Sequence, residues 1–294
     1  MKTRNFILTA MTAGHVKIII IFMAIASLTV LAPAQQTGPV TLRYKFTGGN
    51  DIRYMTNAKM TQAMDIQGQI MNVNVTSAFG CKVAPSGGSG ENLKLKITID
   101  TLGQSTSSPM GESGGAVTEV KGKEFSVVIA PDGKSIDVSD AERIAYNMEG
   151  SGESNLAQTF IDFFPRLPGK PVRVGDTWNT NDTLRSQSSA MKMKTSVDAV
   201  NKLEGIENYG GIECARISSE LSGIQDINVQ NQGMDIKMKG PYTGKSEVLF
   251  AIRDGYFLRQ TASAKMSGTV DISQPEQMSF PVTIDRSSVS EIVK

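Results

Sequence analysis

The sequence predicts a mainly β protein: a curved or barrel-like antiparallel sheet, built from two similar meanders, with a central helical segment. Strict alternation of apolar and polar residues, as in Leu93–Ile99, is typical of half-buried strands. Helical spacing is confined to the middle of the chain, within residues 139–178. Short motifs of the first half recur in the second half, which indicates two related halves.

The N-terminus has the features of a secretory signal peptide. Basic residues precede the apolar run Ile18–Leu31, and Ala32-Pro33-Ala34 then provides an A-x-A cleavage site. At about 1.5 Å per residue this run spans roughly 21 Å, less than the roughly 30 Å of a hydrocarbon core, so we expect no permanent membrane span after cleavage. We expect residues 1–34, begun at Met1 or at Met11, to be removed. The mature protein is then secreted across the inner membrane and is periplasmic or extracellular.

Composition excludes several classes of function. The chain has 30 Lys and Arg, 29 Asp and Glu and one His. Removal of residues 1–34 leaves 27 basic and 29 acidic residues, a net charge of −2 that excludes nucleic acid as a partner. The one histidine, His15, lies in the signal, so we expect no imidazole catalysis, no metal and no cofactor. A hydrolase is the minor alternative, with paired carboxylates drawn from Asp140, Glu142, Asp162 and Asp176.

The mature chain, residues 35–294, is expected to form a single β-rich domain with halves at 35–138 and 179–294. Strands follow from period-two alternation, and Asp132-Gly133 suits the positive φ angles of a tight hairpin turn. The first half has the strands Val40–Phe46 and Leu93–Ile99, the hairpins Ile52–Ile66 with Gln69–Val83 and Phe125–Ala130 with Ser135–Val138, and the mobile loops Pro85–Gly90 and Ser105–Ala116. The second half has the strands Met191–Thr195, Ala215–Leu221, Met234–Met238, Val248–Ile252, Tyr256–Ala264 and Phe280–Ile284.

Two helices are predicted in the central segment, residues 139–178. Ser139 and Glu142 are spaced as a capping box at the start of the first helix. The second helix, from Ser154 to Phe164, has a wide apolar face formed by Leu156, Phe160 and Phe163. This helix is either buried in the core against the sheet or a lid over an apolar cavity.

The two halves match at one constant offset. Gly122-Lys123 corresponds to Gly244-Lys245, and Asp132-Gly133 corresponds to Asp254-Gly255 at the same spacing. Chance similarity of short motifs is the alternative explanation. Because neither half alone would close its edges, we expect both halves to build one β structure.

The segment from Leu167 to Trp178 contains two prolines, the turn Gly175-Asp176 and the sole tryptophan. It resembles the Leu-Pro-x-Lys-Pro-Val-x-x-Gly-Asp-x-Trp signature of an uncharacterised family of secreted bacterial envelope proteins, defined only as a domain of unknown function. The resemblance spans most of the mature chain and implies an envelope protein with no established activity. In physical terms the segment is a turn followed by a tryptophan anchor between the halves.

Methionines recur at alternate positions of several predicted strands, so one face of these strands is rich in thioethers. Flexible, polarisable Met side chains adapt to varied apolar ligands. The predicted ligand-binding set is Met60, Met64, Ile66, Met71, Val73, Met191, Met193, Met234, Ile236, Met238, Leu156, Phe160 and Phe163. Ordinary core packing by the same residues is the alternative, and copper(I), which accepts thioethers, is a third.

The two cysteines of the mature chain, Cys81 and Cys214, have two alternative states. An oxidising compartment favours a disulfide, which would stabilise the fold by about 4–5 kcal/mol in the chain-entropy model. The other state is a pair of buried free thiols that pack as small apolar side chains.

The function that these features favour is a soluble, non-enzymatic cell-envelope protein. Its expected partner is a lipid, another apolar ligand or a lipidated protein, bound in a Met-lined β cavity. The alternative is a structural or protein-interaction module of the envelope, with a solid core and no ligand.

Overall fold

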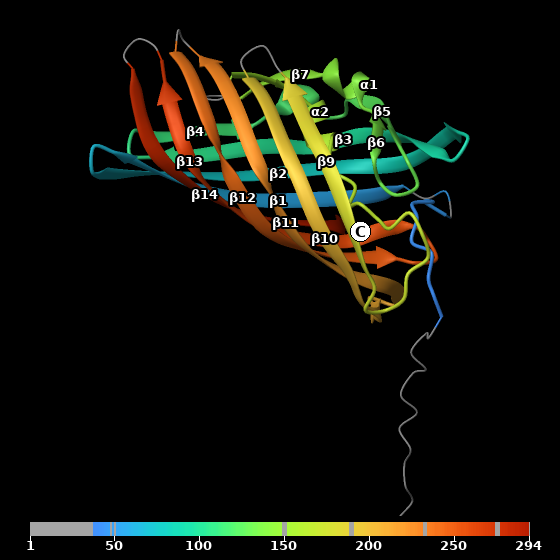
Figure 1. Ribbon diagram of the computed structural model, residues 1–294. Coiled ribbons are helices and arrows are strands. Elements are labelled where there is room, and N and C mark those ends of the chain that lie inside the picture. Colours follow the sequence, from blue (N-terminus) through green and yellow to red (C-terminus); the bar gives the residue numbers. More distant parts are fainter. Residues whose placement is uncertain are drawn as a thin grey trace, which may run out of the picture. The chain divides into compact units, whose positions relative to one another are not determined.

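Figure 1 shows the computed structural model of the chain. By its internal contacts the chain divides into two units, residues 1–34 and residues 35–294. The structure describes residues 38–47, 49, 51–148, 152–187, 191–231, 234–273 and 277–293. The predicted signal peptide, with both candidate start residues and His15, lies outside the described residues.

Strands make up most of the described chain. They are β1 Ile52–Ile66, β2 Gln69–Ser89, β3 Asn92–Ser108, β4 Gly111–Ala116, β5 Glu124–Ile129, β6 Ser135–Asp137, β7 Ala145–Met148, β8 Gly152–Asn155, β9 Thr177–Gln187, β10 Met191–Tyr209, β11 Ile212–Asn231, β12 Met234–Ala251, β13 Tyr256–Ile272 and β14 Met278–Val293. The helices are α1 Ser139–Glu142 and α2 Ala157–Phe160, and a 3₁₀ turn lies at Thr118–Val120.

Twelve strands form one sheet in the order β6-β5-β3-β2-β1-β14-β13-β12-β11-β10-β9, with β4 paired to β3. Each half contributes a meander, and antiparallel pairing of β1 with β14 joins the two. Figure 1 shows the twist of this sheet, in which β9–β13 run obliquely to β1–β3. The predicted fold class is confirmed. The described strands leave the sheet open, with β9 at one edge and β6 and β4 at the other.

The long hairpin lies where the sequence predicts it. β1 and β2 pair along the whole of β1, around a turn in which Gln67 and Gly68 have φ angles of 55° and 85°. The predicted loops Pro85–Gly90 and Ser105–Ala116 are wrong, because β2 continues to Ser89 and the second stretch forms the β3–β4 hairpin. Both stretches lack period-two patterning because most of their residues are exposed, yet their backbone groups still pair.

The segment Val40–Phe46 has the predicted alternation in burial but is not a strand of the sheet. Its four apolar side chains are buried, and its one described β-bridge joins Val40 to Val172. Backbone N–H groups of the segment donate to the carbonyls of Pro131 and Gly255, at the two Asp-Gly turns that repeat in the sequence. Residues 40–47, here called the strap, therefore lie against a turn from each half. Alternation of apolar and polar residues shows that one side of a segment is buried. Such burial does not require hydrogen bonding to a neighbouring strand.

The two predicted helices are each reduced to a single short turn. β7 and β8 occupy much of the first predicted helix and the start of the second, so the long helices are wrong. The predicted capping box is absent, because Val138 is the N-cap residue of α1 and makes no side-chain cap. The Asp137 carboxylate accepts the backbone N–H of Ser139 instead, at 2.9 Å. Segments this short are unstable as isolated helices, so tertiary packing determines their conformation.

The second half has longer strands than predicted, and β9 has no predicted counterpart. The expected strands Met234–Met238 and Val248–Ile252 belong largely to one strand, β12. Gly240 and Gly268 allow β12 and β13 to approach each other closely. A Cβ atom on Gly240 would lie 2.2 Å from the Ser267 carbonyl oxygen, and one on Gly268 would lie 2.2 Å from the Lys239 oxygen. These glycines mark a sheet contact, whereas glycine in a sequence more often suggests a turn.

Candidate functional site: the inner face of the sheet

The helical segment packs on one face of the large sheet, which we call the inner face; the opposite face is the outer face. Phe160 of α2 makes edge-to-face ring contacts with Phe79 of β2 and Phe125 of β5, at centroid distances of 5.7 and 5.2 Å. Side chains alternate between faces along a strand, and cross-strand partners share a face. The pairing registers therefore assign each strand residue to the inner or the outer face.

These registers bring the strand residues of the predicted ligand-binding set onto the inner face. Met64 of β1 pairs with Met71 of β2, while Met193 of β10 and Met238 of β12 both pair with Ile227. The inner-face members are Met60, Met64, Ile66, Met71, Val73, Met191, Met193, Ile236 and Met238. The side chain of Met234 lies outside the described residues. Strands far apart in sequence thus contribute to one surface.

At one end the inner face is covered. Leu156 and Phe160 are buried there, and Phe163 packs against the same cluster. Aromatic rings fill this covered end, with Phe163 contacting Tyr54 and Phe257 at 5.5 and 5.8 Å. The helical part of the predicted ligand-binding set therefore lies in the main core.

The rest of the inner face, here called the open end, is only partly shielded. Five buried residues form its centre: Met266, Val270, Phe280, Val282 and Ile284. Around them pack the partly exposed Met60, Met64, Ile66, Ile236 and Met238. Met71, Val73, Met191 and Met193 are also partly exposed. These side chains form an accessible apolar surface.

A cavity of about 720 Å³ lies between the helical segment and strands β9–β11. Met193 is the one member of the predicted ligand-binding set among its lining residues. The others are mostly polar: Val138, Glu142, Asn155, Ala157, Gln158, Ile161, Arg185, Gln187, Lys192, Lys194, Asp226 and Asn228. This cavity is thus neither Met-lined nor apolar, unlike the cavity that the sequence suggests.

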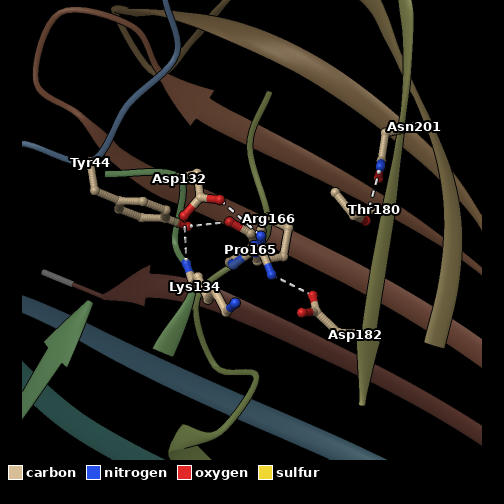
Figure 2. A network of polar contacts seen from close by, with 8 residues as sticks. All are labelled: Tyr44, Asp132, Lys134, Pro165, Arg166, Thr180, Asp182 and Asn201. Carbon is tan, nitrogen blue, oxygen red and sulfur yellow. Dashed lines mark hydrogen bonds and ion pairs between the residues drawn. The ribbon is translucent and has the colours of Figure 1, made fainter. Parts of the chain in front are cut away.

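Arg166 joins the two open edges of the sheet, as Figure 2 shows. Its Nη2 donates to Asp132 Oδ2 in the β5–β6 turn at 2.8 Å, and its Nη1 donates to Asp182 of β9. The three side chains are about a quarter exposed, at 25%, 29% and 24%. Next to Arg166, the Pro165 carbonyl accepts the Tyr44 hydroxyl of the strap at 3.0 Å. This polar network connects two edges of the sheet that no strand pairing among the described residues joins.

Charged side chains are scarce on the inner face. The registers place two within the sheet, Asp182 and Arg286, and a third, Glu213, at a strand end. The outer face instead carries ion pairs such as Lys265–Asp285. Asp182 is paired with Arg166, so Arg286 is the exceptional charge of the inner face.

Arg286 interacts electrostatically with Asp162, which follows α2. Burial raises the pKa of the Asp162 carboxyl, and the charge of Arg286 opposes this. Burial likewise lowers the pKa of the Arg286 guanidinium, and Asp162 opposes that. Burial raises the pKa of nearby Tyr242 to about 12, with Asp162 adding to the rise. Sequence reasoning missed Arg286, although it interrupts the apolar alternation Phe280-Val282-Ile284 of β14.

The two cysteines are buried free thiols, which is the second of the two states that the sequence left open, and no disulfide joins them. Cys81 lies in β2 and Cys214 in β11, with β1, β14, β13 and β12 between them in the sheet order. They belong to different apolar clusters, whereas a disulfide requires Cα atoms within about 7 Å. Burial raises the pKa of both thiols, that of Cys214 to about 11.

The carboxylates considered for acid–base chemistry have different described partners, although Asp140 and Glu142 both belong to α1. Asp140 pairs with Arg143 at 3.0 Å, and Asp176 accepts the backbone N–H of Arg173 at 2.8 Å in its own turn. Glu142 lines the cavity beside the helical segment. Trp178, after the turn, is buried in the main core, where an anchor is expected.

Two further kinds of feature are absent from the part of the chain that the structure describes. They contain no group of three or more His, Cys, Asp or Glu side chains arranged to hold a metal ion. Among them, no helix has both the length and the apolar character needed to cross a membrane.

Comparison with known proteins yields weak structural likenesses. No protein-family model and no curated protein matches the chain. Pseudomonas aeruginosa OccK2 (OpdF) in complex with glucuronate is 6% identical with a TM-score of 0.24, over 83% of this chain and 99% of that one. A DUF1329 family protein from Desulfovibrio piger is 12% identical with a TM-score of 0.16, over 80% of this chain and 83% of that one. Likenesses this weak support no conclusion about family or function, so the resemblance of the Leu167–Trp178 segment stays a prediction.

Proposed function

We propose that the chain is an exported, non-enzymatic envelope protein that binds a lipid-sized apolar ligand on the open end of the inner face. The observation that carries this proposal is the register of the sheet, which gathers Met60, Met64 and Met238 from distant strands onto one partly exposed apolar surface. Contiguous apolar surface of this kind marks interaction sites on soluble proteins. The predicted signal peptide, the periplasmic or extracellular location and the family resemblance belong to the same proposal.

The chemistry of the open end suits an acyl chain. Met side chains are flexible and polarisable, so they adapt to a ligand of variable shape. The outer face next to them carries exposed charges, as at Lys59 and Asp65 of β1, although Ile70, which pairs with Asp65, is exposed there as well. An acyl chain on the inner face would remove the exposed parts of these Met residues from water.

The test is native mass spectrometry of the protein purified from the envelope of cells that export it, before and after mild organic extraction. We expect an extractable adduct of lipid mass. Met64→Glu places a charge within the open end and should abolish the adduct. Thr61→Glu places the same charge at an exposed outer-face position of the same strand and should retain it. A bare polypeptide mass for the wild type and for Thr61→Glu, after gentle purification, contradicts ligand binding.

The second candidate is a structural or protein-interaction module of the envelope. One observation favours it: the five residues at the centre of the open end are buried without any ligand, so part of the inner face is already filled. A module of this kind would retain an envelope protein partner after cross-linking in cells. Loss of that partner in Met64→Glu, with no lipid adduct in the wild type, would select the module over the lipid binder.

A further inference from the structure

The end of the sheet at which β9 stops and β10 begins has an apolar inner side (Figure 1, upper ends of these strands). Five neighbouring strands, β10–β14, contribute one residue each to a single cross-strand row, here called the end row: Met191, Val229, Ile236, Ile272 and Met278. All five side chains are partly exposed. The row is continuous with the open end, because Ile236 and Ile272 pack against the buried residues at its centre. Contiguous exposed apolar surface of this kind marks an interaction site.

The outer side of the same strand ends is basic. Two adjacent outer-face rows of β9–β12 contain five exposed cations, here called the basic patch: Lys192 and Lys237 in one row, and Arg185, Lys194 and Lys239 in the other. None of the five lies within 4.0 Å of a carboxylate of the described residues. Together with the three neighbouring acids, Asp226, Asp235 and Asp271, they give a net charge of +2, whereas residues 35–294 as a whole carry −2. Positive charge is therefore concentrated at this end of the sheet.

We propose that this end of the sheet docks on an anionic lipid bilayer, with the end row at the acyl boundary and the basic patch against the headgroup phosphates. Lys192 follows Met191 by one residue and Lys194 follows it by three, so the two cations lie about 3 and 10 Å from the end row along β10. These heights are comparable with a headgroup layer of roughly 5–8 Å on each side of the hydrocarbon core.

The combination of charge and apolar surface favours a bilayer over an acidic protein. A bilayer presents anionic groups and acyl chains at adjacent depths, which complements the order of the basic patch and the end row. Docking goes beyond ligand binding, because it does not require a lipid to leave the bilayer. It would also bring the Met-rich surface of the open end to the membrane.

The test is co-sedimentation of the purified exported protein with vesicles of phosphatidylethanolamine mixed with phosphatidylglycerol, or of phosphatidylcholine alone. We expect binding to the anionic vesicles only, weakened by high salt because salt screens exposed charges. The double variant Lys192→Gln/Lys237→Gln should weaken this binding about 25-fold, at about fivefold for each cation.

The matched control is Lys59→Gln/Lys245→Gln, which removes two exposed outer-face cations outside the basic patch. On β12, Lys245 lies eight residues beyond Lys237, about 26 Å further from the end row. The control should change vesicle binding by less than about twofold, because this distance exceeds the Debye length. Circular dichroism checks that both double variants are folded.

The end row is tested separately with Ile272→Trp. Vesicles whose acyl chains carry bromine should quench the added indole, whereas the native Trp178 is buried in the main core and should be unaffected. Val200→Trp, at an exposed outer-face position away from the end row, is the control and should stay unquenched. Equal quenching of the two variants overturns the orientation in which the end row meets the membrane.

The outcomes separate docking from the proposed function. Equal affinity of the wild type and Lys192→Gln/Lys237→Gln for anionic vesicles, or an equal loss in the control, overturns the basic patch as the docking surface. Lack of binding to either vesicle overturns membrane docking; an acidic protein cross-linked in cells by the wild type but not by the double variant would then be its partner. A lipid adduct without vesicle binding contradicts docking alone, and vesicle binding without an adduct contradicts ligand binding alone.

Discussion

The covered and open ends of the inner face are built from the same sheet but differ in their side chains. The covered end is aromatic, with ring pairs such as Tyr54–Phe257 stacked at 4.3 Å and Phe125–Phe160 edge-to-face at 5.2 Å. The open end is aliphatic and rich in Met, and its margin is partly exposed. Rigid rings in fixed geometry specify one packing, whereas Met side chains accept several. Alternation of apolar and polar residues along the strands therefore does not distinguish a core from a binding surface.

Contacts at the covered end also hold the two halves of the open sheet together. The strap contacts a turn from each half, and the Tyr44 hydroxyl donates to the carbonyl of Pro165. Arg166 then pairs with Asp132 from one edge and Asp182 from the other. The fold is therefore closed by side chains and a strap at this end, while the other end remains accessible.

Removing a ring from the covered end should produce the largest loss of stability. Phe160 is 1% exposed and contacts three other rings, so Phe160→Ala should lower the free energy of unfolding by about 3–5 kcal/mol. Met64→Ala at the open end is the matched comparison and should cost about 1 kcal/mol, because its side chain is already partly exposed. Urea unfolding followed by circular dichroism measures both. Equal losses would show that the two ends do not differ as described.

Breaking the edge network should have the next largest effect. Arg166→Met leaves the Asp132 and Asp182 carboxylates without their shared cation in partly buried surroundings, at an expected cost of about 2 kcal/mol. The same urea experiment measures it. Arg143→Met removes an exposed ion pair with Asp140 and should change stability by less than about 0.5 kcal/mol. A loss at Arg166 no larger than that at Arg143 would mean that the network does not hold the edges together.

Sequence reasoning predicted the sheet and the β1–β2 hairpin because both depend on local signals. Alternation reports which side of a strand is buried, and Gln67-Gly68 reports the turn. The same reasoning failed for the helical segment. There the apolar residues Leu156, Phe160 and Phe163 are spaced as in a helix, but the spacing reflects their burial against the sheet. An extended or irregular chain can bury the same three side chains as well as a helix can.

The candidate site was predicted in part. Period-two alternation is a local signal, and it correctly placed the Met residues of each strand on one face. Which strands become neighbours in the sheet is not a local property, so the sequence did not show that β1, β2, β10 and β12 contribute to one surface. Arg286 and Arg166 escaped prediction, and Asp162 was considered only as a possible hydrolase carboxylate, because their surroundings depend on partners far away in sequence. Only the interruption of an apolar alternation at Arg286 was visible beforehand, and a single charge within a strand does not identify a ligand.

The smallest expected effect concerns the pH dependence of stability at the border of the two ends. Burial raises the pKa of Asp162 in the folded chain above its unfolded value of about 4, so the folded state holds this proton more tightly. Its contribution is therefore fully present below about pH 4 and is lost as pH rises towards the folded-state pKa. Asp162→Asn has no carboxyl at this position, so its stability should lack this decline with rising pH. The free energy of unfolding of the variant, relative to that of the wild type, should therefore increase between pH 4 and pH 7.

Asp137, the last residue of β6 before the helical segment, provides a control of opposite sign. The backbone N–H of Ser139 donates to its carboxylate and lowers its pKa, so its contribution is present above its unfolded pKa and is lost as pH falls. Asp137→Asn should therefore shift the difference in the other direction over the acidic range. Urea unfolding in steps of pH measures both variants. A slope of the same sign for both would mean that burial does not raise the pKa of Asp162 in the folded chain.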